Sequence, residues 1–425
     1  MTGFTPLSAR NAAARIAAGS LSSEELTRIC LDRIAEREAV VGAWIHLDPE
    51  RALAEARRRD RAGSGPLRGL PIGVKDVMDT HDMPTAYGSP IYAGHRPAAD
   101  AACVALARAA GAVALGKTVT TEFANAHPGK TANPHNRAHT PGGSSSGSAA
   151  AVADGMVPLA FGTQTAGSVI RPAAFCGIVG YKPSFGLIPR TGVKPLADSL
   201  DTVGVLARDV ADAAFFAAAL SNRPELEPGA AMPTPRIKLY RAPEWPQADA
   251  ATHAAIEAAA ERLRRAGAEV TEEGAAPEHQ DLGAAHKVIM EYDSAGCLAF
   301  ERLTHWDQIS AILRERLASG AAISGAEYDE AWRIVERARL ALPRLLGEAD
   351  ALLVPAAPGE APRGLASTGD AVFNRCWTML HAPCVTIPAG RGPNGLPLGA
   401  QLVGRVGDDA RLLRAAAFLE RALAD

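Results

Sequence analysis

Leu70-Pro71-Ile72-Gly73-Val74-Lys75 is the stretch from which the fold of this chain can be read. It is a short apolar run bounded by Pro and Gly, which is typical of a buried β-strand. A second run of this kind lies at residues 112–115, and segments with helical patterns, 99–110 and 148–154, alternate with the two runs. This alternation predicts an α/β fold in which helices cover a β-sheet.

The N-terminal part of the chain is expected to be helical. Residues 7–60 are dominated by Ala, Leu, Glu and Arg, with apolar positions at helical spacing. Ser22 and Glu25 have the spacing of a capping box, in which each side chain satisfies a backbone N–H of the other residue, so a helix should start there. We therefore expect 1–65 to be an N-terminal helical segment that packs on the core.

The second half of the chain adds more helices and then returns to strands. Residues 250–350 show long helical patterns, so we expect 225–348 to form a helical layer or cap. A closing helix is expected from about Asp409, after buried strands at 351–355, 384–388 and 400–403. Because these last strands would rejoin the sheet, we expect 1–425 to form a single domain.

Composition excludes several classes of protein. The chain has 425 residues and a formal net charge of −3 at pH 7, with 47% hydrophobic and 21% charged residues, which is ordinary for a soluble globular protein. No run of Lys or Arg forms a continuous basic stripe, so no nucleic-acid partner is expected. The most apolar windows, 98–116 and 149–162, are interrupted by charged residues, so no membrane span is expected.

The cysteines give no sign of a metal or of a disulfide framework. None of the six stands in a CxxC pair, and they are scattered as Cys30, Cys103, Cys176, Cys297, Cys376 and Cys384. A reducing cytoplasm is therefore the simplest compartment. No metal or organic cofactor is expected.

Two short motifs point to other functions. Residues 111–118 satisfy the phosphate-binding pattern G-x4-G-K-[ST] literally, but the four residues between its glycines look like a strand, whereas a phosphate loop needs a flexible backbone there. Residues 143–147 fit the nucleophile-elbow pattern G-x-S-x-G, with Ser145 as the nucleophile. An elbow needs a strand directly before it, and a turn-rich loop precedes Ser145, so a serine esterase of this kind is the second hypothesis.

Three polar segments supply a different chemistry. Amide hydrolysis needs an activated nucleophile, a proton carrier and donors for the developing oxyanion. Residues 163–168 form a small-residue turn that ends in Ser168, and its backbone N–H groups can converge beside the hydroxyl. Residues 141–148 form a second hydroxyl-rich turn. Lys75 ends a buried run, where desolvation can remove the charge of a lysine and leave it able to accept a proton.

At this point the sequence resembles the amidase signature family. The resemblance rests on Gly73-Val-Lys75-Asp, on Thr140-Pro-Gly-Gly-Ser144-Ser-Ser-Gly-Ser-Ala-Ala-Ala-Val-Ala, and on Gly162-Thr-Gln-Thr-Ala-Gly-Ser168-Val-Ile-Arg-Pro-Ala-Ala-Phe-Cys-Gly. Matching segments around 116–124, 180–184, 200–204 and 395–404 extend it over nearly the whole chain. The resemblance implies one domain with a large mixed β-sheet core and helices on both faces.

The resemblance also implies the roles of the site residues. Ser168 matches the family's nucleophile, Lys75 its base and Ser144 the serine that bridges them, and Ser168 follows Ser144 by 24 residues, the interval of the family motif. In the family the bridging serine follows a cis peptide bond, which we expect at Ser144. The oxyanion hole is expected from the backbone N–H groups of Thr165, Ala166, Gly167 and Ser168.

The motif departs from the commonest family pattern in a direction that bears on substrate. It has Gln164, Ala166 and Ser146 at positions where other residues are usual, and Arg171 follows the nucleophile by three residues. A guanidinium binds a carboxylate through two hydrogen bonds, so Arg171 favours a substrate that carries a carboxylate, with Gln164 as a further contact. This run is similar to that of malonamidases. The alternative is that Arg171 pairs with a protein acid such as Asp201.

The resulting hypothesis is an amidohydrolase that cleaves a small-molecule carboxamide to a carboxylic acid and ammonia or an amine. A tRNA-dependent amidotransferase A-type subunit is an alternative, although it would work with partner subunits. A non-catalytic pseudo-amidase that only binds a ligand is another, although such a protein would be expected to have lost Lys75, Ser144 or Ser168. The expected partner is the amide substrate, and a homodimer stays open.

Overall fold

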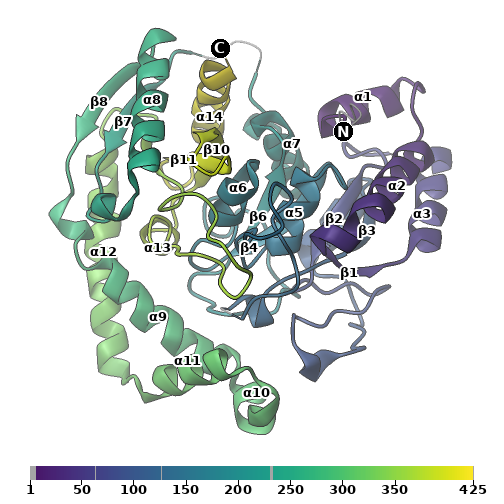
Figure 1. The fold of residues 1–425 in the computed structure, drawn as a ribbon, viewed down its shortest axis with the longest axis horizontal. Coiled ribbons are helices and arrows are strands. Elements are labelled where there is room, and N and C mark those ends of the chain that lie inside the picture. Colours follow the sequence, from purple (N-terminus) through teal and green to yellow (C-terminus); the bar gives the residue numbers. More distant parts are fainter. Residues whose placement is uncertain (1–5, 63, 126, 230–232, 425) are drawn as a thin grey trace.

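A single mixed β-sheet runs through the molecule (Figure 1). The structure is a computed structural model and describes residues 6–62, 64–125, 127–229 and 233–424. Its eleven strands lie in the order β1-β3-β2-β4-β6-β5-β10-β11-β9-β7-β8. The strands are β1 Trp44–Leu47, β2 Pro71–Lys75, β3 Val113–Thr118, β4 Leu159–Gln164, β5 Val179–Lys182, β6 Thr202–Ala207, β7 Arg236–Tyr240, β8 Glu269–Glu273, β9 Ala351–Pro355, β10 Cys384–Arg391 and β11 Pro397–Val403.

Helices cover both faces of this sheet. They are α1 Ala9–Ala17, α2 Ser23–Val41, α3 Pro49–Ala62, α4 Ala102–Ala109, α5 Ser146–Ala153, α6 Ile170–Cys176, α7 Val210–Ser221, α8 Ala250–Arg265, α9 Leu282–Cys297, α10 Ala299–Thr304, α11 Ala311–Ala322, α12 Gly325–Leu346, α13 Arg375–Met379 and α14 Asp409–Ala424. The expected α/β fold, a mixed sheet with helices on both sides, is confirmed.

The core divides into clusters because alternate residues of a strand point to opposite faces. In β4, Leu159 and Phe161 join the cluster formed with α4, α7, α8 and α14, whereas Ala160 between them joins the cluster formed with α2, α5 and α6. In β9, Leu353 faces the first of these clusters, and its neighbours Leu352 and Val354 face a third, formed with α9, α12 and α13.

The middle of the sheet brings the polar motifs together. Strand β2 pairs in parallel with β3 on one side and with β4 on the other, and Gly73 is opposite Ala160. Lys75 and Thr163 therefore both lie a few residues beyond this pair, at the same end of the sheet. The turn 165–168 follows β4 directly and leads into α6, so Ser168 emerges at this end too.

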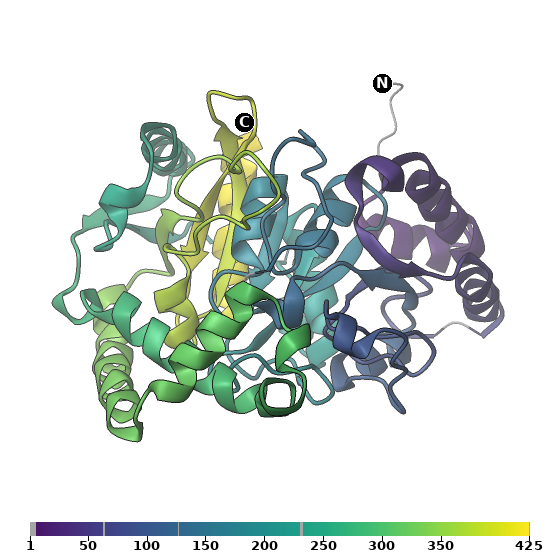
Figure 2. The ribbon, with the colours of Figure 1, turned by 60° about the horizontal axis from the view of Figure 1, so that its bottom comes forward.

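Two predicted helical segments also contain strands. Residues 225–348 include β7 and β8, which close one edge of the sheet, and only α9 to α12 form the expected layer, in green along the lower edge of Figure 2. The sequence of β8, Glu-Val-Thr-Glu-Glu, has no apolar alternation because it is an edge strand, and charged side chains are usual there. Residues 1–65 likewise include β1, although the capping box of Ser22 and Glu25 is present at the start of α2 as predicted.

No helix in the described part of the chain is long and apolar enough to span a membrane. All six cysteines lie in that part and carry free thiols.

Candidate active site

Lys75 is the last residue of β2, and its side chain is completely buried. Its Nζ lies 2.7 Å from Ser144 Oγ and 2.7 Å from Thr163 Oγ1. Burial disfavours the charged ammonium and lowers the pKa of Lys75 to about 7, although the negative charge of Asp201 acts in the opposite direction. A large share of the Lys75 amines is therefore neutral near pH 7 and has a lone pair that can accept a proton.

Ser144 lies in the loop that leads into α5, and the Gly143–Ser144 peptide bond is cis, as expected. The backbone around it is fixed from both sides. Thr121 N–H donates to the Ser144 carbonyl at 3.3 Å, and Arg171 Nη2 donates to the Gly143 carbonyl at 2.6 Å. These contacts keep the Ser144 hydroxyl within hydrogen-bond distance of the Lys75 amine.

Ser168 stands at the end of the turn between β4 and α6, where it lines a cavity. Its carbonyl accepts the N–H of Ser145 at 3.3 Å, so the two hydroxyl-rich segments contact each other directly beside Ser144. Among the described residues, no hydrogen bond joins the two hydroxyls of Ser144 and Ser168. The structure therefore joins Lys75 to Ser144 and brings the backbone of Ser168 next to this pair.

The turn before Ser168 has unused hydrogen-bond donors. In the described part of the chain, no acceptor takes the backbone N–H groups of Thr165, Ala166, Gly167 or Ser168. Their carbonyls are occupied instead: Thr165 O faces His286 Nε2 at 3.1 Å, and Ala166 O accepts the Thr378 hydroxyl at 2.9 Å. A turn whose carbonyls are occupied and whose N–H groups are free is suited to hold a negatively charged oxygen.

The cavity in front of Ser168 has a volume of about 340 Å³ and a strongly cationic lining. The turn 165–168 forms one wall, and α9 and α11 of the helical layer contribute others. The ionisable side chains of its wall, apart from His286, include four cations and one acid: Arg171, Lys287, Arg316, Arg375 and Glu291. Burial lowers the pKa of His286 to about 4, so this histidine is neutral and adds no charge.

Arg171 is only 7% exposed and lines the cavity without an acidic partner in the described part of the chain. Its Nη2 donates to Gly143 O and to Thr368 Oγ1, the latter at 3.2 Å. Burial lowers the pKa of Arg171 to about 10, and the positive charge of Arg375 adds to the effect, so the group remains charged at neutral pH. The alternative partner Asp201 is engaged elsewhere, because it accepts the Thr165 hydroxyl at 2.5 Å.

Gln164 occupies a different place from the one expected. Its side chain is fully buried behind the turn and does not line the cavity. The amide nitrogen donates to Thr378 Oγ1 at 3.0 Å, and the amide oxygen accepts the N–H groups of Val169 and Ile170 at 2.9 and 3.1 Å. These bonds satisfy N–H groups at the start of α6, which have no partner within the helix. Gln164 thus orients the helix that follows Ser168, and this position does not allow a substrate contact.

The two misleading motifs have structural roles. Ser145 is fully buried, and its hydroxyl accepts the Thr163 N–H at 3.3 Å inside the protein, away from the cavity lining. Lys117, the lysine of the phosphate-loop pattern, lies inside β3 and pairs with Asp76 at 3.1 Å. Neither side chain is available to a ligand.

The structure adds several residues to the site in roles that the sequence did not predict. Thr163 contacts the Lys75 amine, Asp201 contacts the turn, and the helical layer supplies His286 and Arg316. For Thr163 a signal was present, since Phe161 and Thr163 alternate along β4 and a polar side chain that follows an apolar one on the same face marks the end of the buried run. Arg316 could not be found this way, because it lies 148 residues beyond Ser168 within a charged helix.

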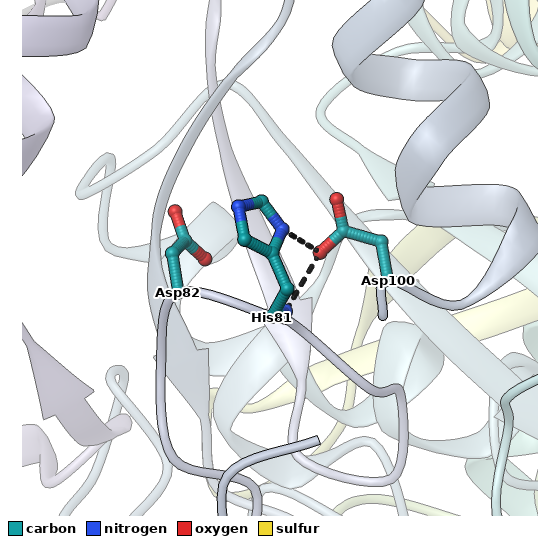
Figure 3. Close-up of side chains that lie close together, drawn as sticks. All are labelled: His81, Asp82 and Asp100. Atoms are coloured by element: carbon teal, nitrogen blue, oxygen red, sulfur yellow. Dashed lines mark hydrogen bonds and ion pairs between the residues drawn. The ribbon is translucent and has the colours of Figure 1, made fainter. Parts of the chain in front are cut away.

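A cluster elsewhere in the structure has side chains of metal-binding type. His81, Asp82 and Asp100 lie together in Figure 3, and His81 Nδ1 is 3.0 Å from Asp100. Two guanidinium groups already neutralise these acids: Arg108 contacts both at 2.6 and 3.0 Å, and Arg51 lies 2.9 Å from Asp82. The cluster is an ion-pair network on the surface, and a cation would have to displace the arginines.

Comparisons with known proteins show the family of this chain. A family model described as Amidase matches residues 25–413. The A-type subunit of the glutamyl-tRNA(Gln) amidotransferase of Chloroflexus aggregans is 36% identical over 474 residues, which cover 97% of this chain and 96% of that protein.

Solved structures give the same result. The native peptide amidase of Stenotrophomonas maltophilia is 31% identical, with a TM-score of 0.80 over 97% of this chain and 96% of its own. A further amidase crystal structure is 29% identical, with a TM-score of 0.88 over 98% of this chain and 99% of its own. The chain therefore belongs to the amidase family, whose members act on C–N bonds.

Proposed function

We propose that this protein hydrolyses a small-molecule carboxamide through an acyl-enzyme formed on Ser168. The observation that carries the proposal is the buried Lys75 amine, 2.7 Å from the Ser144 hydroxyl and without a carboxylate within ion-pair distance among the described residues. A lysine in this state is a proton acceptor rather than a surface cation. Ser168, at the end of the adjoining turn, has both the cavity and the free N–H groups in front of it.

The proposed reaction proceeds in two halves. Neutral Lys75 accepts the proton of the Ser144 hydroxyl, while Ser144 takes the proton of Ser168, whose oxygen attacks the amide carbon. The carbonyl oxygen becomes negative and binds to the N–H groups of the turn 165–168. The C–N bond breaks as the proton returns through Ser144 to the leaving nitrogen. Water then attacks the ester by the same relay, which releases the carboxylic acid and restores Ser168.

The cationic cavity supports a substrate that carries a carboxylate. Arg171 is charged, buried beside the nucleophile and without an ion-pair partner among the described residues. The charges of Arg375 and Arg316 repel it, and Asp370, the ion-pair partner of Arg375, offsets part of this repulsion. An anionic group in the substrate would relieve this repulsion and bind the guanidinium through two hydrogen bonds. The likeness of the nucleophile motif to malonamidases leads to malonamate, the monoamide of a small diacid, as the first substrate to try.

A second candidate function is that of an amidotransferase component that works within a larger assembly. It is favoured by the 36% identity to the A-type subunit of a glutamyl-tRNA(Gln) amidotransferase over nearly the whole of both chains. Glutamine carries a carboxylate, which these cations would attract, and also an ammonium group, for which the described lining offers Glu291 as its one acid. Because malonamate carries the carboxylate without the ammonium group, we prefer an amidase that works without partner subunits.

The test compares malonamate with malonamide, its uncharged analogue, using the isolated protein. We expect kcat/KM to be roughly 10- to 100-fold higher for malonamate, and Arg171→Gln to abolish this ratio, because a charged hydrogen-bonded pair contributes about 1.5–3 kcal/mol. The ratio is the readout because Arg171 also holds Gly143, and a change in that loop affects both substrates alike. Arg333→Gln, an exposed arginine on α12, should leave the ratio unchanged.

Two serine variants complete this test. Ser168→Ala should remove both turnover and labelling by a fluorophosphonate, whereas Ser145→Ala should cost at most about tenfold, since it loses two long hydrogen bonds to the Thr163 backbone. The reverse pattern would favour the elbow hypothesis. Turnover of glutamine but not malonamate would favour the amidotransferase, and loss of all labelling would indicate a pseudo-amidase. Cytoplasmic location and the homodimer stay predictions.

A further inference from the structure

Asp201 is a buried acid beside the candidate site that the proposed reaction does not use. It stands immediately before β6 and is 8% exposed. One carboxylate oxygen accepts the Thr165 hydroxyl at 2.5 Å, and the other accepts the N–H groups of Leu196 and Ala197 at 2.8 and 3.1 Å. Burial raises the pKa of Asp201 to about 6, and the three hydrogen-bond donors oppose this effect, so the carboxylate is mostly ionised at neutral pH.

The contact with Thr165 fixes the start of the turn that ends in Ser168. Strands β4 and β6 pair in antiparallel register with Gln164 opposite Thr202, so Asp201 and Thr165 are the next residues beyond this pair. The Thr165 side chain is held by Asp201, and its carbonyl is held by His286 Nε2 at 3.1 Å. With both groups engaged, the Thr165 N–H has a defined direction.

The same carboxylate acts on the base. Thr163, two residues before Thr165, contacts the Lys75 amine at 2.7 Å. Asp201 provides the negative charge that raises the pKa of Lys75 against the effect of burial. The other ionisable groups that face Asp201 are Arg190 and Lys194, around a void of about 10 Å³ with room for one water, and the Cys297 thiol, whose pKa burial raises to about 12.

We propose that Asp201 is a positioning residue that couples the two halves of the site, because one buried carboxylate orients the oxyanion turn through Thr165 and places a negative charge at the end of β4, where Thr163 contacts the Lys75 amine. The proposal rests on the proposed function in taking Ser168 as the nucleophile and Lys75 as its base. It adds a residue that contacts neither the substrate nor the nucleophile.

The two effects can be separated by substitution. Asp201→Asn keeps the shape but removes the charge, and its amide oxygen can still accept N–H groups while its NH₂ donates to Thr165 Oγ1. Thr165→Val keeps the Asp201 charge but removes the hydroxyl that Asp201 holds, and Thr165→Ser restores that hydroxyl. The first change addresses the base, and the second addresses the turn.

The experiment measures the rate of Ser168 labelling by a fluorophosphonate between pH 5 and 9, which needs no amide substrate. The wild type should gain reactivity as pH rises through about 7, the pKa of Lys75, because labelling needs the neutral amine. In Asp201→Asn this midpoint should fall by about 0.5 pH unit, since the lost negative charge no longer supports the ammonium. Asp307→Asn, an exposed acid in the helical layer, should not move the midpoint.

Thr165→Val should lower the plateau rate about tenfold at an unchanged midpoint, and Thr165→Ser should recover most of it. A midpoint for Asp201→Asn equal to that of the wild type would overturn the proposal, as would equal plateaus for the Val and Ser variants. If Asp201→Asn does not fold, as judged by circular dichroism, the Thr165 pair alone decides. A wild type that labels normally but hydrolyses no amide would refute the proposed function and leave this test intact.

Discussion

Lys75 and Lys117 lie on neighbouring parallel strands, and the structure gives them opposite roles. Both side chains are completely buried. Lys117 Nζ lies 3.1 Å from an Asp76 carboxylate oxygen and donates to Thr85 Oγ1 at 2.5 Å and to Met78 O at 2.8 Å. Among the described residues, Lys75 Nζ forms hydrogen bonds only with two hydroxyl groups, those of Ser144 and Thr163.

The difference lies in what surrounds each amine. Burial lowers the pKa of both lysines, but the adjacent Asp76 carboxylate opposes this at Lys117, so an ion pair forms inside the protein. At Lys75 burial is opposed only by the charge of Asp201, which forms no ion pair with it in the described part of the chain, and the pKa falls to about 7. The first lysine therefore stabilises the fold, and the second is available for proton transfer.

Replacing Lys75 should have the largest effect, and it should affect activity rather than stability. We expect Lys75→Met to lower kcat/KM by about 10³- to 10⁴-fold, because the proton acceptor is lost. The free energy of unfolding should change by no more than about 1–2 kcal/mol, since Met has a similar volume and two buried hydroxyls lose one partner. Steady-state kinetics and urea unfolding test both parts, and a variant with near-normal activity would contradict the comparison.

Replacing Lys117 should reverse this pattern. Lys117→Met leaves the Asp76 carboxylate buried without its cation, which should reduce the free energy of unfolding by about 3–5 kcal/mol. The double variant Lys117→Met with Asp76→Asn should recover much of this loss, because no uncompensated charge remains. The urea midpoints of the two variants give the answer, and a single variant as stable as the wild type would show that Lys117 is not the structural member of the two.

The smallest expected effect comes from removing a threonine hydroxyl that is hydrogen-bonded to one of the two lysine amines. Thr163→Val removes one of the two groups that orient the Lys75 amine and should lower kcat about tenfold with little change in KM. The matched change Thr85→Val removes a hydroxyl from Lys117 and should cost about 1 kcal/mol of stability with unchanged kcat. Equal effects of the two substitutions on kcat would remove the distinction between the lysines.

Much of the fold could be predicted from apolar patterns. The expected strands near 71–74, 351–355 and 384–388 are present because buried strands need continuous apolar runs, which are visible in a sequence. Strand β8 was missed because three of its five residues are glutamates. Only Val270 and Thr271 are residues that favour a strand. An edge strand gains its stability from one neighbour, β7, and its composition does not record that pairing.

Only some features of the candidate site could be predicted, because the sequence gives residue types but not the contacts that orient their side chains. Lys75, Ser144 and Ser168 stand in motifs whose residue types indicate their chemistry. The direction of Gln164 was not predictable, because whether its amide points to the cavity or to the start of α6 depends on the backbone of the turn. The sequence also could not decide whether Arg171 pairs with Asp201. Asp201 instead binds the Thr165 hydroxyl and two backbone N–H groups, and these contacts depend on the tertiary structure.

The sequence by itself determined the family motifs, the alternation of strands and helices, and the residue types of the proposed nucleophile and base. Only the tertiary structure decided which of Lys75 and Lys117 has an acid beside it, which cations face the cavity, and that Asp201 holds the Thr165 side chain. The physical reason is that the charge state of a buried group depends on desolvation and on distances to side chains remote in sequence. Asp201 lies 126 residues beyond Lys75 along the chain, and only the pairing of β4 with β6 brings it near the base.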